Sequence, residues 1–253
     1  MKITISDANK ILQFSTILGN LKQFLENTTC QIKEDGMYFQ GLDQTHSCMI
    51  ECRLKKEWFD LYENDENLVI SFNTTMIQKV LNARHESQEI EIEYEKDDDV
   101  LMIGFTKGNN FNKTFEISLL HVENNNFEIQ DTETDVDLTI DTKKMHDLIA
   151  NLANFNDELN MNFTEDKIIF AAKGLEGTMN VEIDFNDVTE YAVGENTELT
   201  QSFNLKILNQ MCNYCKLTNE MNIGFTNGRP MNLKYLVGDN SYVQFYLAPK
   251  VDD

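Results

Sequence analysis

Thiols and imidazoles at close spacing are the residues of this chain that could bind a metal or carry redox chemistry. Cys212 and Cys215 form a C-x-x-C pair, and His46, Cys48 and Cys52 lie in one short segment. The pair falls in a helical pattern with no second C-x-x-C, and the segment alternates like a strand, which sends neighbouring side chains to opposite faces. Structural thiols are therefore favoured over zinc binding or disulfide exchange at both places.

Carboxylates and glycine-rich loops offer little more catalytic chemistry. The run 97–99 (DDD) separates two strand-like patterns, which is typical of a solvated hairpin turn rather than a metal site. Neither a G-x-G-x-x-G, nor a Walker loop, nor a G-x-S-x-G motif occurs. We expect no catalytic residue, no cofactor and no metal; a metal-dependent hydrolase remains the weakest alternative, resting on scattered carboxylates and the His/Cys groups.

Composition limits the class of protein further. The 253 residues are 41% hydrophobic, enough for one large domain or two smaller ones, and no apolar run is long enough to span a membrane. Five cysteines, an odd number, favour reduced thiols in an intracellular compartment. The net charge of −22 argues against ordinary nucleic-acid binding, which usually relies on a basic surface.

The chain resembles itself at a spacing of about 131 residues, which predicts two similar domains in tandem. Near the ends the spacing falls to about 128. The matching segments are 34–39 with 165–170, 71–73 with 202–204, 90–92 with 221–223, and 115–119 with 243–247. We expect domains at residues 1–120 and 134–253, joined by a polar, acidic connector at 121–133.

Each half shows two amphipathic helical patterns among strand-like runs. Helices are predicted over 7–18, 73–85, 141–152 and 204–216, with Asp7 or Ser6, Asn73, Asp141 and Asn204 at their starts. Alternating patterns at 89–95 and 179–185, and turn residues between the runs, predict antiparallel strands. The fold class is therefore α+β.

Several segments resemble the proliferating cell nuclear antigen family of eukaryotic-type DNA sliding clamps. They are the tail 245–250 (FYLAPK) with acidic residues after it, the stretch 32–54 with Gly36, Gln40, Leu42-Asp43 and His46, and the stretch 68–81. The resemblance implies the DNA clamp fold: two domains, each with two helices packed on antiparallel sheets. It further implies a ring of three subunits, with helices inside and sheets outside.

Two strands favour self-association independently of the resemblance. The runs 113–119 and 177–183, one from each domain, alternate well and would be hazards if left as open edges. Pairing one with the other on a neighbouring molecule is a head-to-tail contact that can close a ring. The predicted interface residues are Phe115, Ile117, Gly177, Met179 and Val181.

The charge of the helical segments bears on whether a ring could hold DNA. Segments 7–22, 73–85, 141–153 and 204–216 carry +5 in total, which leaves −27 on the rest of the chain. The lining would attract duplex phosphates weakly, while the exterior repels them within about 8–10 Å. The alternative is that helices simply contain more lysine than loops. The predicted DNA-facing residues are Lys10, Lys22, Lys79, Arg84, Lys143, Lys144, Lys206 and Lys216.

The resemblance also implies a pocket for a short docking motif with an aromatic and aliphatic plug. Its positions are Leu42, His46, Ser47, Phe127, Ile129, Pro230, Tyr246, Ala248 and Pro249. Phe127 and Ile129 are apolar on an otherwise polar connector, which is typical of an interaction site, although they could instead anchor the connector to its own domain. Glu165 stands where the resemblance places a modification lysine.

These observations predict a homotrimeric processivity clamp with no enzymatic activity. It would encircle double-stranded DNA, be opened by a clamp loader, and tether DNA polymerase, flap nuclease and ligase in replication and repair. The alternatives are a subunit of a heterotrimeric checkpoint-type clamp and an acidic adaptor that does not encircle DNA. The expected location is the nucleus, or a cytoplasmic replication compartment if the protein is viral.

Overall fold

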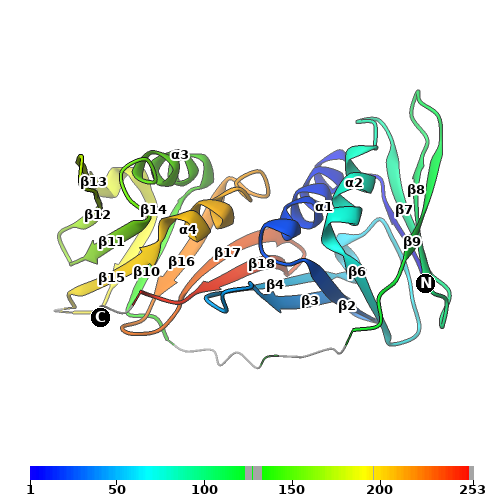
Figure 1. Ribbon diagram of the computed structural model, residues 1–253, viewed down its shortest axis with the longest axis horizontal. Helices are drawn as coiled ribbons and strands as arrows, with labels where there is room; N and C mark the ends of the chain where they lie inside the picture. Colours follow the sequence, from blue (N-terminus) through cyan, green and yellow to red (C-terminus); the bar gives the residue numbers. More distant parts are fainter. Residues whose placement is uncertain (123–126, 128–132, 196, 251–253) are drawn as a thin grey trace. The chain divides into compact units, whose positions relative to one another are not determined.

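The two halves of the chain repeat one order of elements in the computed structural model, which describes residues 1–122, 127, 133–195 and 197–250 (Figure 1). The first half contains β1 (Lys2–Ile5), α1 (Ala8–Asn20), β2 (Asn27–Lys33), β3 (Gly36–Leu42), β4 (Cys48–Lys55), β5 (Leu61–Glu63), β6 (Leu68–Asn73), α2 (Thr74–Asn82), β7 (Glu89–Glu93), β8 (Val100–Thr106) and β9 (Lys113–Ser118). Short 3₁₀ turns follow α1 and β4, at Leu21–Gln23 and Lys56–Trp58.

The second half follows the same order with its own elements. These are β10 (Val136–Asp141), α3 (Thr142–Leu152), β11 (Glu158–Phe163), β12 (Ile168–Lys173), β13 (Thr178–Ile183), β14 (Val188–Val193), β15 (Leu199–Asn204), α4 (Leu205–Cys212), β16 (Glu220–Phe225), β17 (Met231–Gly238) and β18 (Ser241–Leu247). A 3₁₀ turn, η3 (Phe185–Asp187), connects β13 to β14. The matched segments of the sequence repeat fall on equivalent elements, so the predicted tandem duplication is confirmed.

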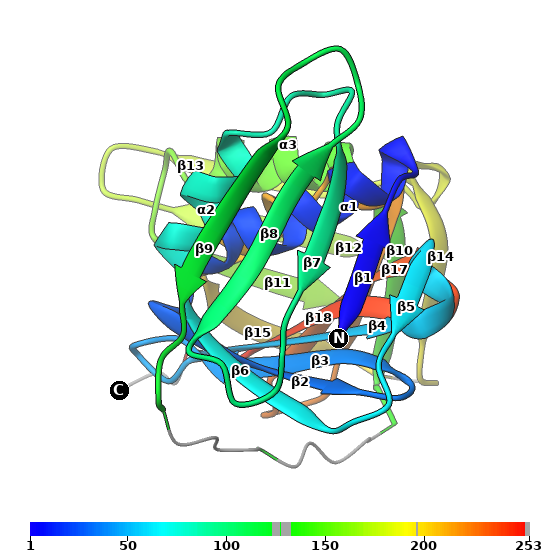
Figure 2. The ribbon, with the colours of Figure 1, turned by 90° about the vertical axis from the view of Figure 1, so that its right-hand side faces the viewer.

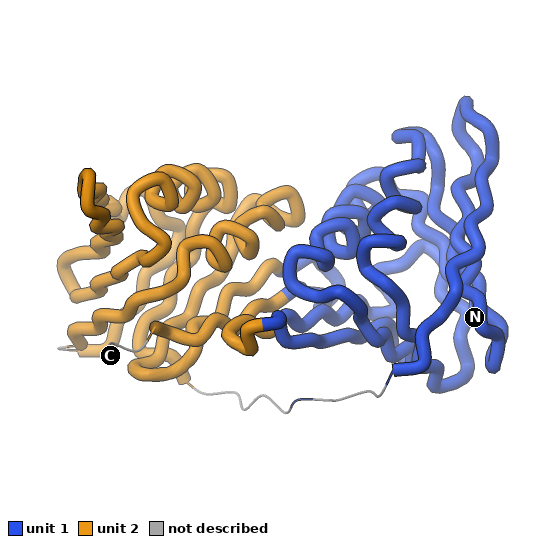
Figure 3. Tube along the Cα trace, viewed as in Figure 1, with its two compact units in different colours: residues 1–44, 50–128, 236–243 blue, residues 45–49, 129–235, 244–253 orange. Residues whose placement is uncertain are grey.

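Contacts divide the described chain into two compact units (Figure 3). The first unit holds residues 1–44, 50–128 and 236–243, and the second holds residues 45–49, 129–235 and 244–253. The strands β17 and β18 therefore contribute residues to both units. The predicted boundaries at 120 and 134 follow the sequence repeat instead and stay a prediction.

Every strand pairing in the described residues with a resolved register is antiparallel. In the first half the strand orders are β5-β1-β7-β8-β9 and β6-β2-β3-β4, and Figure 2 shows β9 at the edge beside β8. In the second half the equivalent orders are β14-β10-β16-β17-β18 and β13-β12-β11-β15. The predicted α+β class, with two helices on antiparallel sheets in each half, is confirmed.

Side-chain caps begin all four helices at the predicted residues. Asp7 accepts hydrogen bonds from the backbone N–H groups of residues 9 and 10, and Asp141 accepts them from those of residues 143 and 144. Asn73 and Asn204 each accept one from the third residue of the following helix, at 3.1 and 3.2 Å. Such caps satisfy N–H groups that the first helical turn leaves without a partner.

The helices pack in pairs, α1 beside α2 and α3 beside α4 (Figure 1). Each buries one apolar stripe at helical spacing, for example Met145, Ile149 and Leu152 of α3. The opposite face of each helix is left to solvent, and it is there that charged side chains can act.

The first unit contains the one tryptophan of the chain, Trp58, fully buried beneath α1. Its ring lies 6.4 Å from the ring of Phe14 and 5.1 Å from that of Phe59. Its Nε1 donates to the carbonyl oxygen of Val237 at 3.2 Å, so the buried indole N–H is satisfied. The core of the second half uses Tyr214, Tyr235 and Phe245 instead.

Candidate functional site

The exposed faces of the four helices carry a small excess of positive charge. Within the helix bounds of the structure each helix has a net charge of +1, so the helices together carry +4 and the rest of the chain carries −26. Asp147 is the one acidic residue among the four helices, all of which lie in the described part of the chain. The predicted segregation of charge therefore holds at the level of the elements, although it is modest.

The predicted DNA-facing cations differ in their exposure to solvent and in their contacts within the chain. The side chains that are exposed are Lys22, Lys79, Lys143, Lys144, Lys206 and Lys216. Lys144 is exposed but paired with Asp187, 2.8 Å from Nζ to Oδ1. Half-buried Lys10 lies over the ring of Trp58, with Nζ 5.9 Å from its centroid. Their role toward DNA stays a prediction.

Arg84 is the most constrained of these cations. Its Nη1 donates to the carbonyl oxygens of His85, Glu86 and Gln88 at 2.8–3.0 Å, which ties the turn after α2. Burial of the guanidinium lowers the pKa of Arg84 from its usual value. The side chain thus stabilises a local turn in addition to any role toward a polyanion.

Part of the predicted docking pocket lies within the second unit, where the C-terminal tail is fixed at several points. The backbone N–H of Ala248 donates to the carbonyl oxygen of Ser47 at 2.8 Å. Two residues further on, the N–H of Lys250 donates to the carbonyl oxygen of Ser202 at 2.7 Å. These bonds hold Ala248 and Pro249 between the turn before β4 and the strand β15.

An ion pair adds to these backbone contacts at the end of the tail. The Nζ of Lys250 lies 2.5 Å from Oε2 of Glu158 on β11. The hydrogen bond from Lys250 lowers the pKa of the Glu158 carboxyl below its ordinary value. The tail therefore depends partly on an exposed, pH-sensitive contact.

Gln201, buried at 6% exposure on β15, was not singled out by the sequence. Its Nε2 donates to the carbonyl oxygens of Thr226 and Arg229, at 3.0 and 3.3 Å, and so fixes the turn that carries exposed Pro230. Its Oε1 is buried without a hydrogen-bond partner. A polar residue facing inward on a strand is a signal that pattern analysis could have flagged.

The remaining pocket positions of this unit lie on the turn before β4 and on β18. His46 is exposed, with a φ of 57° in the left-handed region, which is uncommon for a residue other than glycine. Tyr246 is half-buried near the end of β18. Whether these side chains bind a partner stays a prediction.

Two further pocket positions, Leu42 and Phe127, belong to the first unit. Leu42 ends β3, and Phe127 on the connector is 41% exposed. The side-chain amide of Gln40 fixes this point of the connector to β3. In the orientation that satisfies both groups, its oxygen accepts from the N–H of Phe127 at 2.7 Å, and its nitrogen donates to the carbonyl oxygen of Phe127 at 3.2 Å. The backbone is thus anchored while the aromatic ring is presented to solvent. Ile129 lies outside the described residues.

The thiols and carboxylates that could have suggested metal chemistry are dispersed. Cys48, Cys52 and Cys212 are buried, and burial raises the pKa of the Cys52 and Cys212 thiols. The run 97–99 forms the turn between β7 and β8. Within the described ranges no group of three or more His, Cys, Asp or Glu side chains could hold a metal ion.

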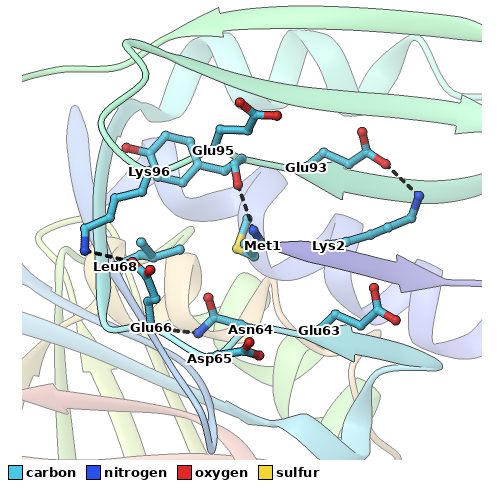
Figure 4. Close-up of a pocket in the computed structure, with 11 residues that line it drawn as sticks. Met1, Lys2, Glu63, Asn64, Asp65, Glu66, Leu68, Glu93, Glu95 and Lys96 are labelled. Atoms are coloured by element: carbon cyan, nitrogen blue, oxygen red, sulfur yellow. Dashed lines mark hydrogen bonds and ion pairs between the residues drawn. The ribbon is translucent and has the colours of Figure 1, made fainter.

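A hollow of about 450 Å³ lies in the first unit beside the N-terminus, lined by several carboxylates (Figure 4). Two of them are paired within the chain: Lys2 with Glu93 at 2.7 Å, and Lys96 with Glu66 at 2.8 Å. The terminal amine donates to the carbonyl oxygen of Tyr94. This hollow contains none of the predicted site residues.

None of the described helices has the length and apolar character needed to cross a membrane.

The predicted interface residues lie on, or next to, two strands at the edges of their sheets. Among the described strands, β9 is hydrogen-bonded only to β8, and β13 only to β12. Phe115 and Ile117 share one face of β9, and Met179 and Val181 share one face of β13. Gly177 immediately precedes β13. Their part in association stays a prediction.

Comparison with known proteins gives consistent matches along the chain. The model of the proliferating cell nuclear antigen N-terminal domain matches residues 7–127, and that of the C-terminal domain matches residues 128–250. The chain is 25% identical over 246 residues to a proliferating cell nuclear antigen of Chaetomium thermophilum, covering 94% of each chain. It is 22% identical to proliferating cell nuclear antigen 2 of Drosophila melanogaster, covering 97% of this chain and 96% of the relative. It is also 25% identical to proliferating cell nuclear antigen 1 of Plasmodium falciparum, with 92% and 91% covered.

Proposed function

Since the chain belongs to the proliferating cell nuclear antigen family, we propose that it is a processivity clamp that encircles duplex DNA as a homotrimer. It acts in the nucleus, or in a cytoplasmic replication compartment if it is viral. It has no catalytic centre of its own, and its role is to keep other proteins on the template. The observation that carries this proposal is the opposite sign of the charge on the four helices, +4, and on the rest of the chain, −26.

The small size of the helix charge determines how the clamp holds DNA. Each phosphate contact that a lysine makes contributes to a steep dependence of affinity on salt, so a few exposed lysines give weak, salt-sensitive contacts. Such contacts allow sliding. Retention then depends on closure of the ring around the duplex, while the acidic exterior keeps DNA from binding elsewhere.

Partners dock through a short motif that presents an aromatic and aliphatic plug. Within the second unit, the fixed tail and the turn with Pro230 present apolar groups, and in the first unit the connector presents the ring of Phe127. An anchored backbone lowers the entropy cost of binding, because these walls are ordered before the partner arrives. We expect DNA polymerase, flap nuclease and ligase to bind in this way, and a separate ATP-driven loader to open the ring.

The test combines the mass in solution with retention on DNA. We expect light scattering to give the mass of three 29.3 kDa subunits. Loaded protein should remain on circular DNA and leave linear DNA by its ends. A monomer that leaves both templates at the same rate would exclude a clamp.

Charge reversal on the helices tests the role of the lining. The double variant Lys79→Glu with Lys206→Glu should leave the ends of linear DNA faster at low salt, without changing retention on circular DNA or the mass of the trimer. The matched control is Lys33→Glu with Lys167→Glu, because both lysines are exposed and lie outside the helices. Equal effects of the two double variants would show that the helices do not face DNA.

The small charge of the helices also favours a second candidate, a subunit of a heterotrimeric clamp in which other subunits supply the basic lining. The two candidates differ in a simple property. A heterotrimeric subunit would stay monomeric when purified alone, whereas the proposed homotrimer assembles unaided.

A further inference from the structure

The strand β14 leaves one edge of its sheet open. It ends the strand order β14-β10-β16-β17-β18, and among the described strands it is hydrogen-bonded only to β10. Its sequence, 188–193 (VTEYAV), is rich in β-branched and aromatic residues and contains neither lysine nor proline. Those two residues commonly protect an exposed edge from further pairing. The edge of β14 is therefore able to accept an added strand.

The pairing with β10 shows which backbone groups of β14 face the open edge. The N–H of Gly194, one residue beyond the strand, donates to the carbonyl oxygen of Asp135 at 3.1 Å. Hydrogen-bonded pairs alternate with non-hydrogen-bonded pairs in an antiparallel ladder, so the N–H and C=O of Ala192 also point toward β10. Those of Tyr191 and Val193 therefore point to the open edge.

A hollow of about 320 Å³ lies beside this strand on the second unit. Tyr191 of β14 and Phe185 of η3 form its aromatic wall, with the two rings stacked and their centroids 5.4 Å apart, and Val188 adds an apolar side chain. The hydroxyl of Tyr191 donates to the carbonyl oxygen of Thr164 at 2.7 Å, which fixes the ring in place. Because Phe185 is 44% exposed, this wall is already formed and open to solvent.

The charge around the hollow is negative. Glu165 and Glu190 line it, and no lysine or arginine is among the described residues of its lining. The segment 182–190 (EIDFNDVTE) carries −4 and no basic residue. Lys144 pairs with Asp187 and offsets one of these charges, which leaves −3. A cation is therefore favoured in the hollow, and a phosphate group is disfavoured.

The open edge, the aromatic wall and the negative charge together favour one kind of side chain. A ring face attracts a cation, and the planar guanidinium of arginine stacks on rings better than the ammonium of lysine. In an added strand, the residue opposite Tyr191 sends its side chain to the same face of the sheet as Tyr191. An arginine at that position would extend over the rings of Tyr191 and Phe185, toward the turn that carries Glu165.

We propose that the edge of β14 binds an extended segment of a partner protein as an added antiparallel strand, with an arginine of that segment in the hollow beside Phe185. The backbone of Tyr191 and Val193 supplies hydrogen bonds that give affinity, and the hollow supplies the preference for arginine. The surface differs from the predicted docking pocket, because none of the described residues of that pocket lines the hollow. It does not depend on the trimer, since all its residues belong to the second unit.

Titration of the full chain with labelled peptides tests the preference for arginine. The probe is a short peptide that alternates threonine and valine on either side of one central arginine, and fluorescence anisotropy follows its binding. A matched peptide with glutamine in place of the arginine should bind about 2- to 30-fold more weakly, the range expected for the loss of one cation–π contact.

Substitutions in the hollow test where the arginine binds. Phe185→Ala and Glu165→Gln should each weaken binding of the arginine peptide several-fold and leave binding of the glutamine peptide nearly unchanged. Phe185→Leu keeps an apolar side chain but no ring, and should behave like Phe185→Ala. The matched controls are Phe111→Ala and Glu176→Gln, which replace an exposed aromatic residue and an exposed carboxylate elsewhere. Both controls should bind the arginine peptide as wild type does.

Backbone substitutions test the added strand. Because the backbone groups of Tyr191 point to the open edge, the arginine opposite it forms a hydrogen-bonded pair with it. N-methylation of the arginine and of every second residue from it should abolish binding, whereas methylation of the intervening residues should not. On the protein, Val193→Pro removes an N–H that faces the open edge and leaves the bonds to β10 in place. It should weaken binding of both peptides.

The outcomes separate this inference from the proposed function. An arginine peptide that does not bind, that binds no more tightly than the glutamine peptide, or that still binds when methylated at the positions facing β14 would overturn the inference. A Val193→Pro variant with an altered mass in light scattering and unchanged peptide binding would assign the edge to a second copy of the chain, and would also overturn it. Selective binding that is lost in Phe185→Ala would support it, whether or not the chain encircles DNA.

Discussion

Replacing Gln201 by leucine should disorder the predicted docking surface of the second unit while leaving the stability of that unit nearly unchanged. The side chain is 6% exposed, donates two hydrogen bonds to the turn that carries Pro230, and buries Oε1 without a partner. Leucine keeps a similar volume but removes both donated bonds and the buried acceptor. The turn would then lose its tie to β15 without a cavity being opened beneath it.

The magnitude follows from these opposing terms. Two neutral hydrogen bonds contribute about 1–3 kcal/mol in total, and removing the unsatisfied acceptor returns about 1–3 kcal/mol. We therefore expect the free energy of unfolding of Gln201→Leu to lie within about 1 kcal/mol of wild type. Gln201→Ala leaves a cavity as well and should cost about 2–4 kcal/mol.

Urea unfolding and titration with a docking-motif peptide measure the two effects. The leucine variant should bind the peptide several-fold more weakly despite its near-normal stability, because the Pro230 turn is no longer fixed. Thr200→Val on the same strand is the control: it loses an exposed hydrogen bond to Asn162 and does not touch the turn. If the leucine variant were as unstable as the alanine variant, or bound the peptide as tightly as wild type, the role assigned to Gln201 would be refuted.

Three further outcomes are expected. Asn73→Ala should lower the free energy of unfolding by about 1 kcal/mol, measured by thermal denaturation, because α2 loses its N-cap. Lys250→Met should lower the free energy of unfolding by roughly 0.2–1 kcal/mol at neutral pH, because it removes the ion pair with Glu158. The pKa of Glu158 is lowered in the folded state, so this difference from wild type should be complete above pH 4.5 and should vanish as the pH falls through the lowered pKa. Gly36→Ala should lower the free energy of unfolding in urea more than Gly228→Ala does. A Cβ at Gly36 would lie 2.1 Å from a backbone carbonyl oxygen of β4, whereas no atom lies within 4 Å of a Cβ at Gly228. Equal losses for the two variants would show that the backbone of β4 moves easily to accept the added Cβ.

Much of the fold could be predicted because local signals and the repeat agree. Asp7, Asn73, Asp141 and Asn204 are capping residues followed by apolar residues at helical spacing, and all four cap helices in the structure. Helix ends were less accurate. The helix expected to reach residue 216 ends at Cys212, because the residues after it form turns that the apolar spacing alone does not reveal.

The candidate site could be predicted only in part, because side-chain bonds to backbone groups leave no periodic pattern. The positions of Tyr246 and Ala248 follow from the tail motif. The ties made by Gln40 and Gln201 do not, since a glutamine at a strand position does not indicate which carbonyl it reaches.

The position of Trp58 makes the chain its own spectroscopic reporter. The single indole is buried among Phe14, Phe59 and the carbonyl of Val237, all of which belong to the first unit. Its fluorescence therefore follows the melting of that unit alone, whereas circular dichroism sums over both. Any separation between the two curves would give the order in which the duplicated halves lose their structure, without a label or a truncated chain.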